Sequence, residues 1–398
     1  MAEGKRDTIR TRPPYRLLPG GAPVESAAMS VVVASLPGMT TMAWLRGQAV
    51  GGALTRGASL AEVMARLEFV QADPIRAPAP AQDLILRQRV PGYRVGDLER
   101  AYPSLPLDED LLYAYGFVTQ PLRRVLHPRR TRIAPDGNYR PTGLAAEVLA
   151  FVRQRGVTHP RDAQAAFGRR SVTNGWGGRS AATTRALEEL HWHGLVRVAR
   201  RERGVRLYEP APPLPEPLAA EERARRIALR VAATFAPLPE ATFRELLRMT
   251  RFLVRPAALV SQLVDSGELT VATVDGMRYV WPTVLPEVPA EPDGRVRFLA
   301  PFDPVVWDRR RFAHLWGWEY RFEAYTPAAK RRWGYYALPL LWRDRVIGWV
   351  NCARDGETVE AGFIDGVPKS RRFAAAFDAE VDRLRTFLTP RGRSSATG

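Results

Sequence analysis

Residues 178–211 read GRSAATTRALEELHWHGLVRVARRERGVRLYEPA, and this stretch changes from helical to extended character at Gly194. Up to that glycine the apolar residues recur at helical spacing, and glycine is a common residue just past the end of a helix. Two extended runs follow, LVRVARR and GVRLYEPA, joined by Glu202, Arg203 and Gly204. The pattern predicts a helix followed by a two-stranded hairpin.

Two further helices are expected upstream of this stretch. TGLAAEVLAFVRQRG (142–156) has the periodicity of an amphipathic helix, and THPRDAQAAFG (158–168) that of a short capped helix. Three helices and then a hairpin is the order of a winged helix, in which the third helix can enter a DNA groove and the wing can touch phosphates. We therefore expect a winged helix over 141–212.

The same succession recurs over 219–285 without close sequence identity. Three helical runs, EERARRIALRVAATFA, TFRELLRM and RPAALVSQLVDSGEL, precede the extended runs LTVATV and MRYVWP around Asp275 and Gly276. A first unit over 39–140 has helical runs at 40–54, 59–70 and 81–90, with Ser59 as a helix cap and a hairpin or wing expected around Asp136 and Gly137. The sequence thus predicts tandem winged helices.

The two ends of the chain differ from this pattern. Residues 1–38 mix Arg, Pro and Gly without periodicity, which predicts a disordered or untranslated tail. Residues 292–390 are aromatic and rich in strand formers, with RDR (343–345) between two apolar runs and a final helix near 373–388. The expected fold class is α+β: tandem winged-helix units followed by a C-terminal β-rich domain.

Charge is the strongest global indication of a partner. Lys and Arg number 59 against 42 Asp and Glu, giving a formal net charge of +17 and a pI near 10.7. Such a surface favours a polyanion, most commonly nucleic acid. The chain has no apolar run of about 18 residues, which argues against a membrane span. Its single Cys352 excludes an intrachain disulfide and a cysteine-ligated cluster, and a reducing cytoplasm fits this composition.

Basic residues gather in three places where DNA contacts are expected, although for each of them a solvated surface charge is an alternative. The first place is the end of the first unit, the second is the expected wing of 141–212, and the third is a charged and aromatic stretch expected to form a hairpin. The residues are Arg129, Arg130, Arg132, then Arg197, Arg200, Arg201, Arg203, Arg206, and then Lys330, Arg331, Arg332. Tyr335, Tyr336, Trp307, Trp316 and Trp318 are expected to serve packing instead.

Cofactor chemistry finds little support. No Gly-rich phosphate loop follows a strand, and His191 and His193 are two residues apart on an expected helix, so they do not face each other. We expect neither a metal nor an organic cofactor.

Gln71, Ala72 and Asp73 offer a different kind of site. They follow a helical run, and Pro74 forces Asp73 toward extended geometry. In extended backbone the side chains of Gln71 and Asp73 point to the same side, so a carboxylate and a carboxamide can together hold and polarise a water. The alternative is that both side chains only satisfy backbone groups at a helix end, and the three-residue motif alone favours this alternative.

Three segments resemble the winged-helix DNA glycosylases of the YcaQ/AlkX and AlkZ type. They are FVQADPI (69–75), RQRVPGY (87–93) and the long block LAPFDPVVWDRRRFAHLWGWEYRFEAYTPAAKRRWGYYALPLLWRDRVIGW (299–349), and the resemblance spans about residues 40 to 385. It implies tandem winged helices, a C-terminal β domain and a catalytic Q-x-D motif at Gln71 and Asp73, as in the aspartate-containing branch. It also implies removal of N7-alkylated purines from double-stranded DNA, with unhooking of N7-linked interstrand crosslinks as a further activity.

The resemblance predicts a monofunctional enzyme that works as a monomer at the nucleoid. Asp73 would stabilise an oxocarbenium-like sugar and activate water, and Gln71 would position that water. Two other functions remain open from the sequence. A winged-helix transcriptional regulator would act as a dimer on paired half-sites, and a non-catalytic adduct-binding or resistance protein would retain affinity for the lesion without releasing a base.

Overall fold

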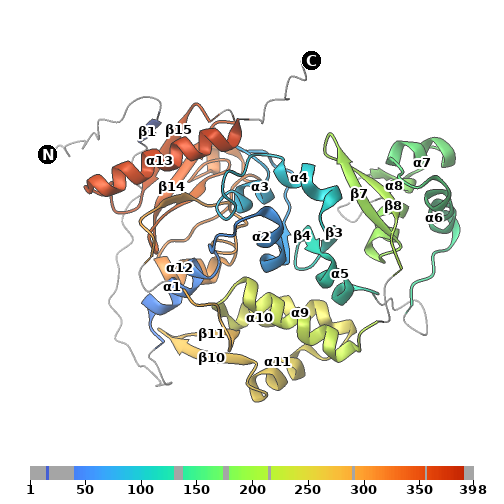
Figure 1. Ribbon diagram of the computed structural model, residues 1–398, viewed down its shortest axis with the longest axis horizontal. Helices are drawn as coiled ribbons and strands as arrows, with labels where there is room; N and C mark the ends of the chain where they lie inside the picture. The colour runs from blue at the N-terminus through green and yellow to red at the C-terminus, as the bar shows by residue number, and fades with distance from the viewer. Residues whose placement is uncertain are drawn as a thin grey trace.

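The computed structural model describes residues 15–17, 40–129, 138–173, 179–213, 217–288, 292–354 and 356–389. Helices and sheets are interleaved along the chain in an α+β fold, as predicted (Figure 1). None of the helices in the described ranges is long and apolar enough to cross a membrane.

The first unit surrounds a small antiparallel sheet of strand order β2-β4-β3. Ser59 caps α2 as predicted, since its hydroxyl accepts a hydrogen bond from the backbone N–H of Glu62 at 3.2 Å. The hairpin expected around Asp136 and Gly137 lies outside the described residues, and the hairpin seen here is β3–β4. The elements are α1 (Met42–Gly51), α2 (Leu60–Leu67), β2 (Phe69–Gln71), α3 (Ala81–Leu86), α4 (Asp97–Ala101), η1 (Tyr102–Ser104), β3 (Leu107–Leu111), β4 (Tyr115–Thr119) and α5 (Gln120–Leu126).

The second unit has the predicted order of three helices and a terminal hairpin. At the tip of the hairpin, Arg203 and Gly204 both have positive φ, 50° and 83°, which is the signature of a two-residue turn that matches the twist of its strands. The elements are α6 (Gly143–Arg155), α7 (Pro160–Phe167), β5 (Ser171–Thr173), β6 (Arg179–Ala181), α8 (Ala182–Trp192), β7 (Val196–Glu202) and β8 (Val205–Pro210). We call β7–β8 the wing hairpin.

The third unit repeats this succession of helices and hairpin. Its strands form a sheet of order β10-β11-β9, and Asp275 and Gly276 make the predicted turn, with φ of 45° and 78°. The elements are α9 (Ala220–Thr234), β9 (Leu238–Pro239), α10 (Glu240–Leu246), η2 (Leu247–Phe252), α11 (Pro256–Asp265), β10 (Leu269–Val274) and β11 (Met277–Pro282).

The C-terminal region is a sheet of order β1-β15-β14-β13-β12 covered by the long helix α13 (Figure 1). The RDR segment forms the predicted turn, with Arg343 at φ 58°. Backbone of residues 15–17 forms β1, parallel to β15, which differs from the disordered segment expected there. The elements are β1 (Tyr15–Leu17), β12 (Val296–Phe298), α12 (Arg309–Trp316), η3 (Ala328–Lys330), β13 (Leu338–Trp342), β14 (Arg345–Cys352), β15 (Val359–Phe363) and α13 (Arg371–Leu388).

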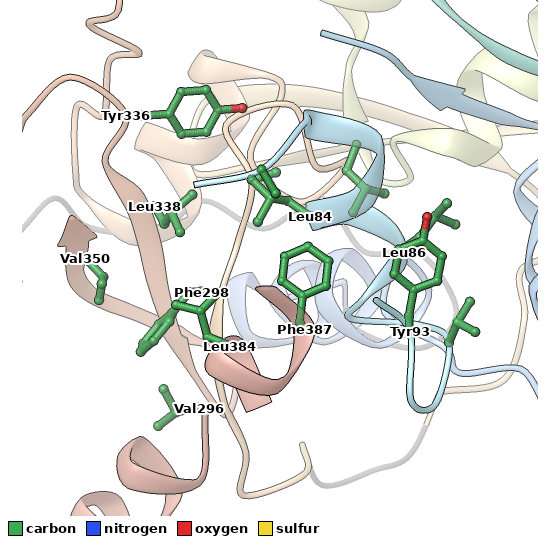
Figure 2. Packing of buried hydrophobic residues seen from close by; sticks show 14 of the residues in the cluster. Leu84, Leu86, Tyr93, Val296, Phe298, Tyr336, Leu338, Val350, Leu384 and Phe387 are labelled. Carbon is green, nitrogen blue, oxygen red and sulfur yellow. The ribbon is translucent and has the colours of Figure 1, made fainter. Parts of the chain in front are cut away.

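Hydrophobic cores cross most of the predicted unit boundaries. Leu84 and Leu86 of the first unit pack in one cluster with Phe298 and Phe387 of the C-terminal region (Figure 2). A second cluster joins the first unit to the third. The cluster of the second unit lies wholly within 139–208. Apart from Tyr139 at its edge, the described residues of this cluster all belong to 141–212, so this predicted unit has a core of its own.

Candidate active site at the end of strand β2

The backbone at Gln71 is extended, as the sequence predicts. Gln71 lies opposite Gly116 of β4, and the N–H of Ala72 continues the pairing with a 2.9 Å hydrogen bond to the carbonyl of Tyr115. A side chain at Gly116 would place its Cβ 2.3 Å from the carbonyl oxygen of Val70, so only glycine allows this close approach. β2 therefore delivers Asp73 to the edge of the small sheet.

Asp73 is a half-buried carboxylate whose two oxygens have different surroundings. Its Oδ1 accepts a 2.9 Å hydrogen bond from the backbone N–H of Ile75, the local bond that the helix-end interpretation requires. Among the described residues, Oδ2 has no hydrogen-bond partner. Burial raises the pKa of Asp73, and the Ile75 N–H opposes this shift. The backbone bond therefore leaves half of the carboxylate available for chemistry.

Gln71 and Asp73 have different partners. The Gln71 Oε1 accepts a 2.9 Å hydrogen bond from the indole N–H of Trp307. Gln82, which sequence reasoning missed, instead lies beside Asp73, since its Oε1 accepts the Asp73 backbone N–H at 3.4 Å. The expectation that Gln71 and Asp73 jointly hold one water stays a prediction, because no hydrogen bond joins their side chains among the described residues.

Asp73 and Gln82 line a cavity of about 910 Å³ that lies between the first unit and the wing hairpin. On one side the lining comes from the segment after β2, from α3 and from the aromatic residues Tyr102, Tyr115 and Phe117. The other side is the wing hairpin, which contributes Arg201, Arg203, Gly204, Val205 and Arg206. A carboxylate thus faces a group of arginines across a space large enough for part of a nucleic acid.

The acidic strand β3 holds the wing hairpin at this cavity. Asp108, Glu109 and Asp110 are consecutive, and each is at most 3% exposed. Asp108 pairs with Arg197 at 2.5 Å, and Glu109 pairs with Arg201 at 2.5 Å. Buried carboxylates are costly unless paired, so the second unit is docked by charges that satisfy one another. We call these contacts the β3 clamp.

Asp110 extends the β3 clamp to the end of α5. It pairs with Arg129 at 2.8 Å and with His127 at 2.6 Å. Burial raises the pKa of Asp110, but Arg129 and His127 outweigh it and hold the value below the ordinary one. Burial lowers the pKa of His127 to about 4, with Asp110 opposing. His127 is therefore neutral at pH 7.

Three of the expected DNA contacts are structural in this arrangement. Arg197 and Arg201 belong to the β3 clamp. The guanidinium of Arg129 donates to the backbone carbonyl of Trp192 at 2.9 Å and stacks on the Trp192 ring at 4.2 Å from its centroid. Their charges are matched by carboxylates, which makes them poor phosphate ligands.

The remaining basic residues have different surroundings. Arg203 is exposed at the tip of the wing hairpin, and the Arg206 guanidinium lies 5.0 Å from the ring centroid of Tyr115. Arg200 makes an exposed pair with Glu202 at 2.8 Å. Arg130 and Arg132 lie outside the described residues. For Arg203 and Arg206, both on the cavity, contact with DNA stays a prediction.

The hairpin expected at Lys330, Arg331 and Arg332 is wrong. Lys330 ends the short helix η3, and the residues that follow form a loop ahead of β13, because Glu323 accepts hydrogen bonds from the backbone N–H groups of Arg332 and Trp333. Lys330 and Arg332 are exposed, while Arg331 is partly buried and lies 4.9 Å from the ring centroid of Tyr335.

The aromatic residues and histidines follow the packing expectation with one exception. Trp318 and Tyr336 are buried, but Tyr335 is 43% exposed. The Nε2–H of His191 donates a hydrogen bond to the backbone carbonyl of Glu109 at 2.8 Å, so His191 packs against strand β3 beside the β3 clamp. Within the described ranges, no group of three or more His, Cys, Asp or Glu side chains is arranged to hold a metal ion.

The sequence contains one signal that the second unit docks on β3. LDEDL (107–111) places three acids in a row in a strand, which is unusual unless basic partners cover them. Trp307 and Gln82 gave no comparable signal, because their relation to the Q-x-D motif depends on tertiary contacts.

Comparison with known proteins agrees with this geometry. The sequence matches the AlkZ-like family, described as DNA glycosylase AlkZ-like, over residues 64–387. The fold is similar to that of the Streptomyces sahachiroi DNA glycosylase AlkZ, with a TM-score of 0.57 at 14% identity, covering 88% of this chain and 97% of that one. The family match spans the positions of Gln71 and Asp73 and most of the C-terminal sheet, and it supports an enzyme of DNA repair rather than a transcriptional regulator. The chain belongs to the AlkZ-like DNA glycosylase family.

Proposed function

We propose that this DNA glycosylase removes N7-alkylated purines from double-stranded DNA and leaves an abasic site for base excision repair. The observation that carries the proposal is the Asp73 carboxylate, whose free Oδ2 belongs to a residue lining the cavity opposite the arginines of the wing hairpin. Arg203 and Arg206 attract the phosphate backbone, and the carboxylate attracts positive charge on the sugar and base.

The chemistry of the substrate explains why a single carboxylate suffices. Alkylation at N7 makes the purine cationic, so the base leaves as a neutral molecule when it takes the electron pair of its bond to C1′. The sugar becomes oxocarbenium-like, and Asp73 stabilises this cation. Water then adds to C1′ and passes one proton to Asp73, while Gln71 positions the water. No general acid is required for the leaving group.

The same argument extends the substrate class. An N7-linked interstrand crosslink contains the same glycosidic bond and the same cationic leaving group, so we include crosslinks among the proposed substrates. Among the described residues that line the cavity none is a lysine, which supports hydrolysis over Schiff-base lyase chemistry. We propose that a monomer acts on chromosomal DNA in the cytoplasm, since base release needs no dimer symmetry.

The test uses a duplex with a single N7-methylguanine and, as a control, the same duplex without the methyl group. We expect the wild-type protein to release free 7-methylguanine, identified by mass spectrometry, with strand breaks only after alkali. Release no faster than the spontaneous rate, from this duplex and from a crosslinked one, would contradict the proposed substrate class. Strand breaks without alkali would contradict the monofunctional mechanism.

A further inference from the structure

The carboxamide of Gln71 has a fixed orientation, and the cause lies 236 residues away in the chain. The indole N–H of Trp307 is 2.9 Å from the Gln71 Oε1. An indole N–H can only donate, so the atom facing it must be the carbonyl oxygen of the amide and not the NH₂ group. The Gln71 NH₂ group therefore points away from Trp307, and no hydrogen bond occupies it among the described residues.

Trp307 itself is held on both sides. The centroid of its ring lies 4.7 Å from the ring centroid of Phe235, and the two rings are inclined by 30°. The ring centroid of Tyr113 lies 5.2 Å away on the other contact, with an interplanar angle of 70°. Its backbone N–H donates to the carbonyl of Asp303 at 2.9 Å. Aromatic contacts of this kind fix the plane of the ring as well as contributing stability.

The turn that carries Trp307 rests on a fully buried ion pair. Asp303 and Arg89 are each 0% exposed, and their side chains meet at 2.7 and 3.0 Å. The Asp303 Oδ1 also accepts the N–H of Val305 at 3.0 Å, which closes the turn. Arg89 in turn belongs to the first unit, immediately after α3. The C-terminal region is thus fastened rigidly to the unit that contains Gln71.

From this chain of contacts we propose that Trp307 is a positioning residue that fixes Gln71, the residue before the cavity-lining Ala72 and Asp73, as a hydrogen-bond donor in the reaction. The inference rests on the proposed function and deepens it. With its carbonyl occupied, Gln71 contributes N–H groups to an acceptor, either the attacking water oxygen or an oxygen of the sugar. Positioning of this kind lowers the barrier because the donor is already oriented before the reaction.

The test is a double-mutant cycle in the full-length protein with the duplex that contains N7-methylguanine. Trp307→Phe keeps an aromatic ring between Phe235 and Tyr113, and removes the N–H together with part of the indole. We expect it to lower the single-turnover rate of base release about 3- to 10-fold, the size of one hydrogen bond, with the half-saturating protein concentration unchanged. In a Gln71→Ala background the same substitution should have no further effect, because the group it positions is gone.

Trp316→Phe is the matched control. The indole N–H of Trp316 donates to the carbonyl of Asp344 at 2.8 Å, in the same region but without contact to Gln71. Its removal should leave the rate unchanged. Equal rates for wild type and Trp307→Phe, or effects of Trp307→Phe and Gln71→Ala that multiply, would overturn the proposal. A wild-type protein that releases no base would instead overturn the proposed function.

A second measurement does not depend on the folding of a Trp307 variant. In protein labelled with ¹⁵N at its tryptophans, the Trp307 indole proton should exchange slowly in the wild type and faster in Gln71→Ala. Equal exchange in both proteins would show that the hydrogen bond does not orient Gln71, and it would overturn the proposal.

Discussion

The second and third units are built in the same order but attach to the first unit by different forces. The third unit shares an apolar core with it, in which Leu122 and Val118 pack with Phe243 and Leu263. The second unit keeps its core to itself and meets the first through the β3 clamp and through polar contacts such as the Tyr102 hydroxyl on the carbonyl of Val198, at 2.8 Å. Of the second and third units, the second is therefore the one that lines the cavity, and ion pairs hold it in place.

This difference matters because apolar and ionic contacts respond to different conditions. An apolar interface is insensitive to pH and strengthens with burial, whereas a charged interface depends on protonation and on every partner being present. The third unit is thus fixed to the first by a shared apolar core, whereas the position of the second unit depends on ion pairs.

The largest expected effects come from truncating one side chain in the core that the third unit shares with the first, and one in the core of the second unit. Phe243→Ala and Leu187→Ala both remove fully buried side chains and should each cost about 3 to 5 kcal/mol of local stability. Phe243→Ala should accelerate amide hydrogen exchange in both the third and the first unit. Leu187→Ala should accelerate exchange within 141–212 alone. If both variants accelerated amide hydrogen exchange in the first unit equally, the second and third units would not differ in how they attach to it.

The next effect concerns the β3 clamp. Glu109→Ala leaves Arg201 and the Tyr115 hydroxyl without their shared carboxylate and should cost about 3 kcal/mol in the free energy of unfolding. Glu202→Ala removes only an exposed pair with Arg200 and should cost less than about 1 kcal/mol. Denaturant unfolding of both variants measures the difference. Similar losses for the two would mean that the clamp is no stronger than a surface pair.

The clamp should also weaken in acid. The pKa of His127 is near 4 when folded and near the ordinary value of about 6.5 when unfolded, so the unfolded chain binds the extra proton first. The contribution of His127 to stability is complete above about pH 6.5 and declines as the pH falls toward 4, by up to about 3 kcal/mol. Unfolding at pH 7 and pH 5 should show this decline in wild type and less of it in His127→Gln.

The smallest expected effect separates a DNA contact from a clamp residue. Arg203 is exposed at the tip of the wing hairpin, so Arg203→Ala should reduce the slope of log Kd against log salt concentration by about 1. Arg129→Ala should leave the slope unchanged and lower stability instead, because Arg129 is paired with Asp110. An unchanged slope for Arg203→Ala would remove the wing tip from the DNA interface.

The sequence predicts what depends on local spacing. The helix ending at Gly194, the hairpin turn at Arg203 and Gly204 and the cap at Ser59 all follow from residues within a few positions of one another. Local spacing does not predict the conformation of the exposed stretch at Lys330, because it depends on Glu323, a side chain from an earlier loop that accepts hydrogen bonds from backbone N–H groups.

The site itself was predicted only in part. Gln71 and Asp73 are recognisable because Pro74 fixes the backbone beside them. The contacts around them are not, because Trp307 is 236 residues from Gln71, and the clamp residue Arg201 is 92 residues from Glu109. A positive charge near a groove also looks the same in sequence whether a phosphate or a buried carboxylate neutralises it. Arg129, Arg197 and Arg201 differ from Arg203 only through tertiary contacts.

The most direct test of this account is the single-turnover rate of 7-methylguanine release by Asp73→Asn, with the Kd for the same duplex measured in parallel. Asparagine keeps an acceptor for the Ile75 N–H but has no charge, so the local turn persists while the carboxylate is lost. We predict a rate lower by about 10²- to 10⁴-fold with an unchanged Kd. A rate equal to that of wild type would show that Asp73 only caps the backbone and that the chemistry occurs elsewhere.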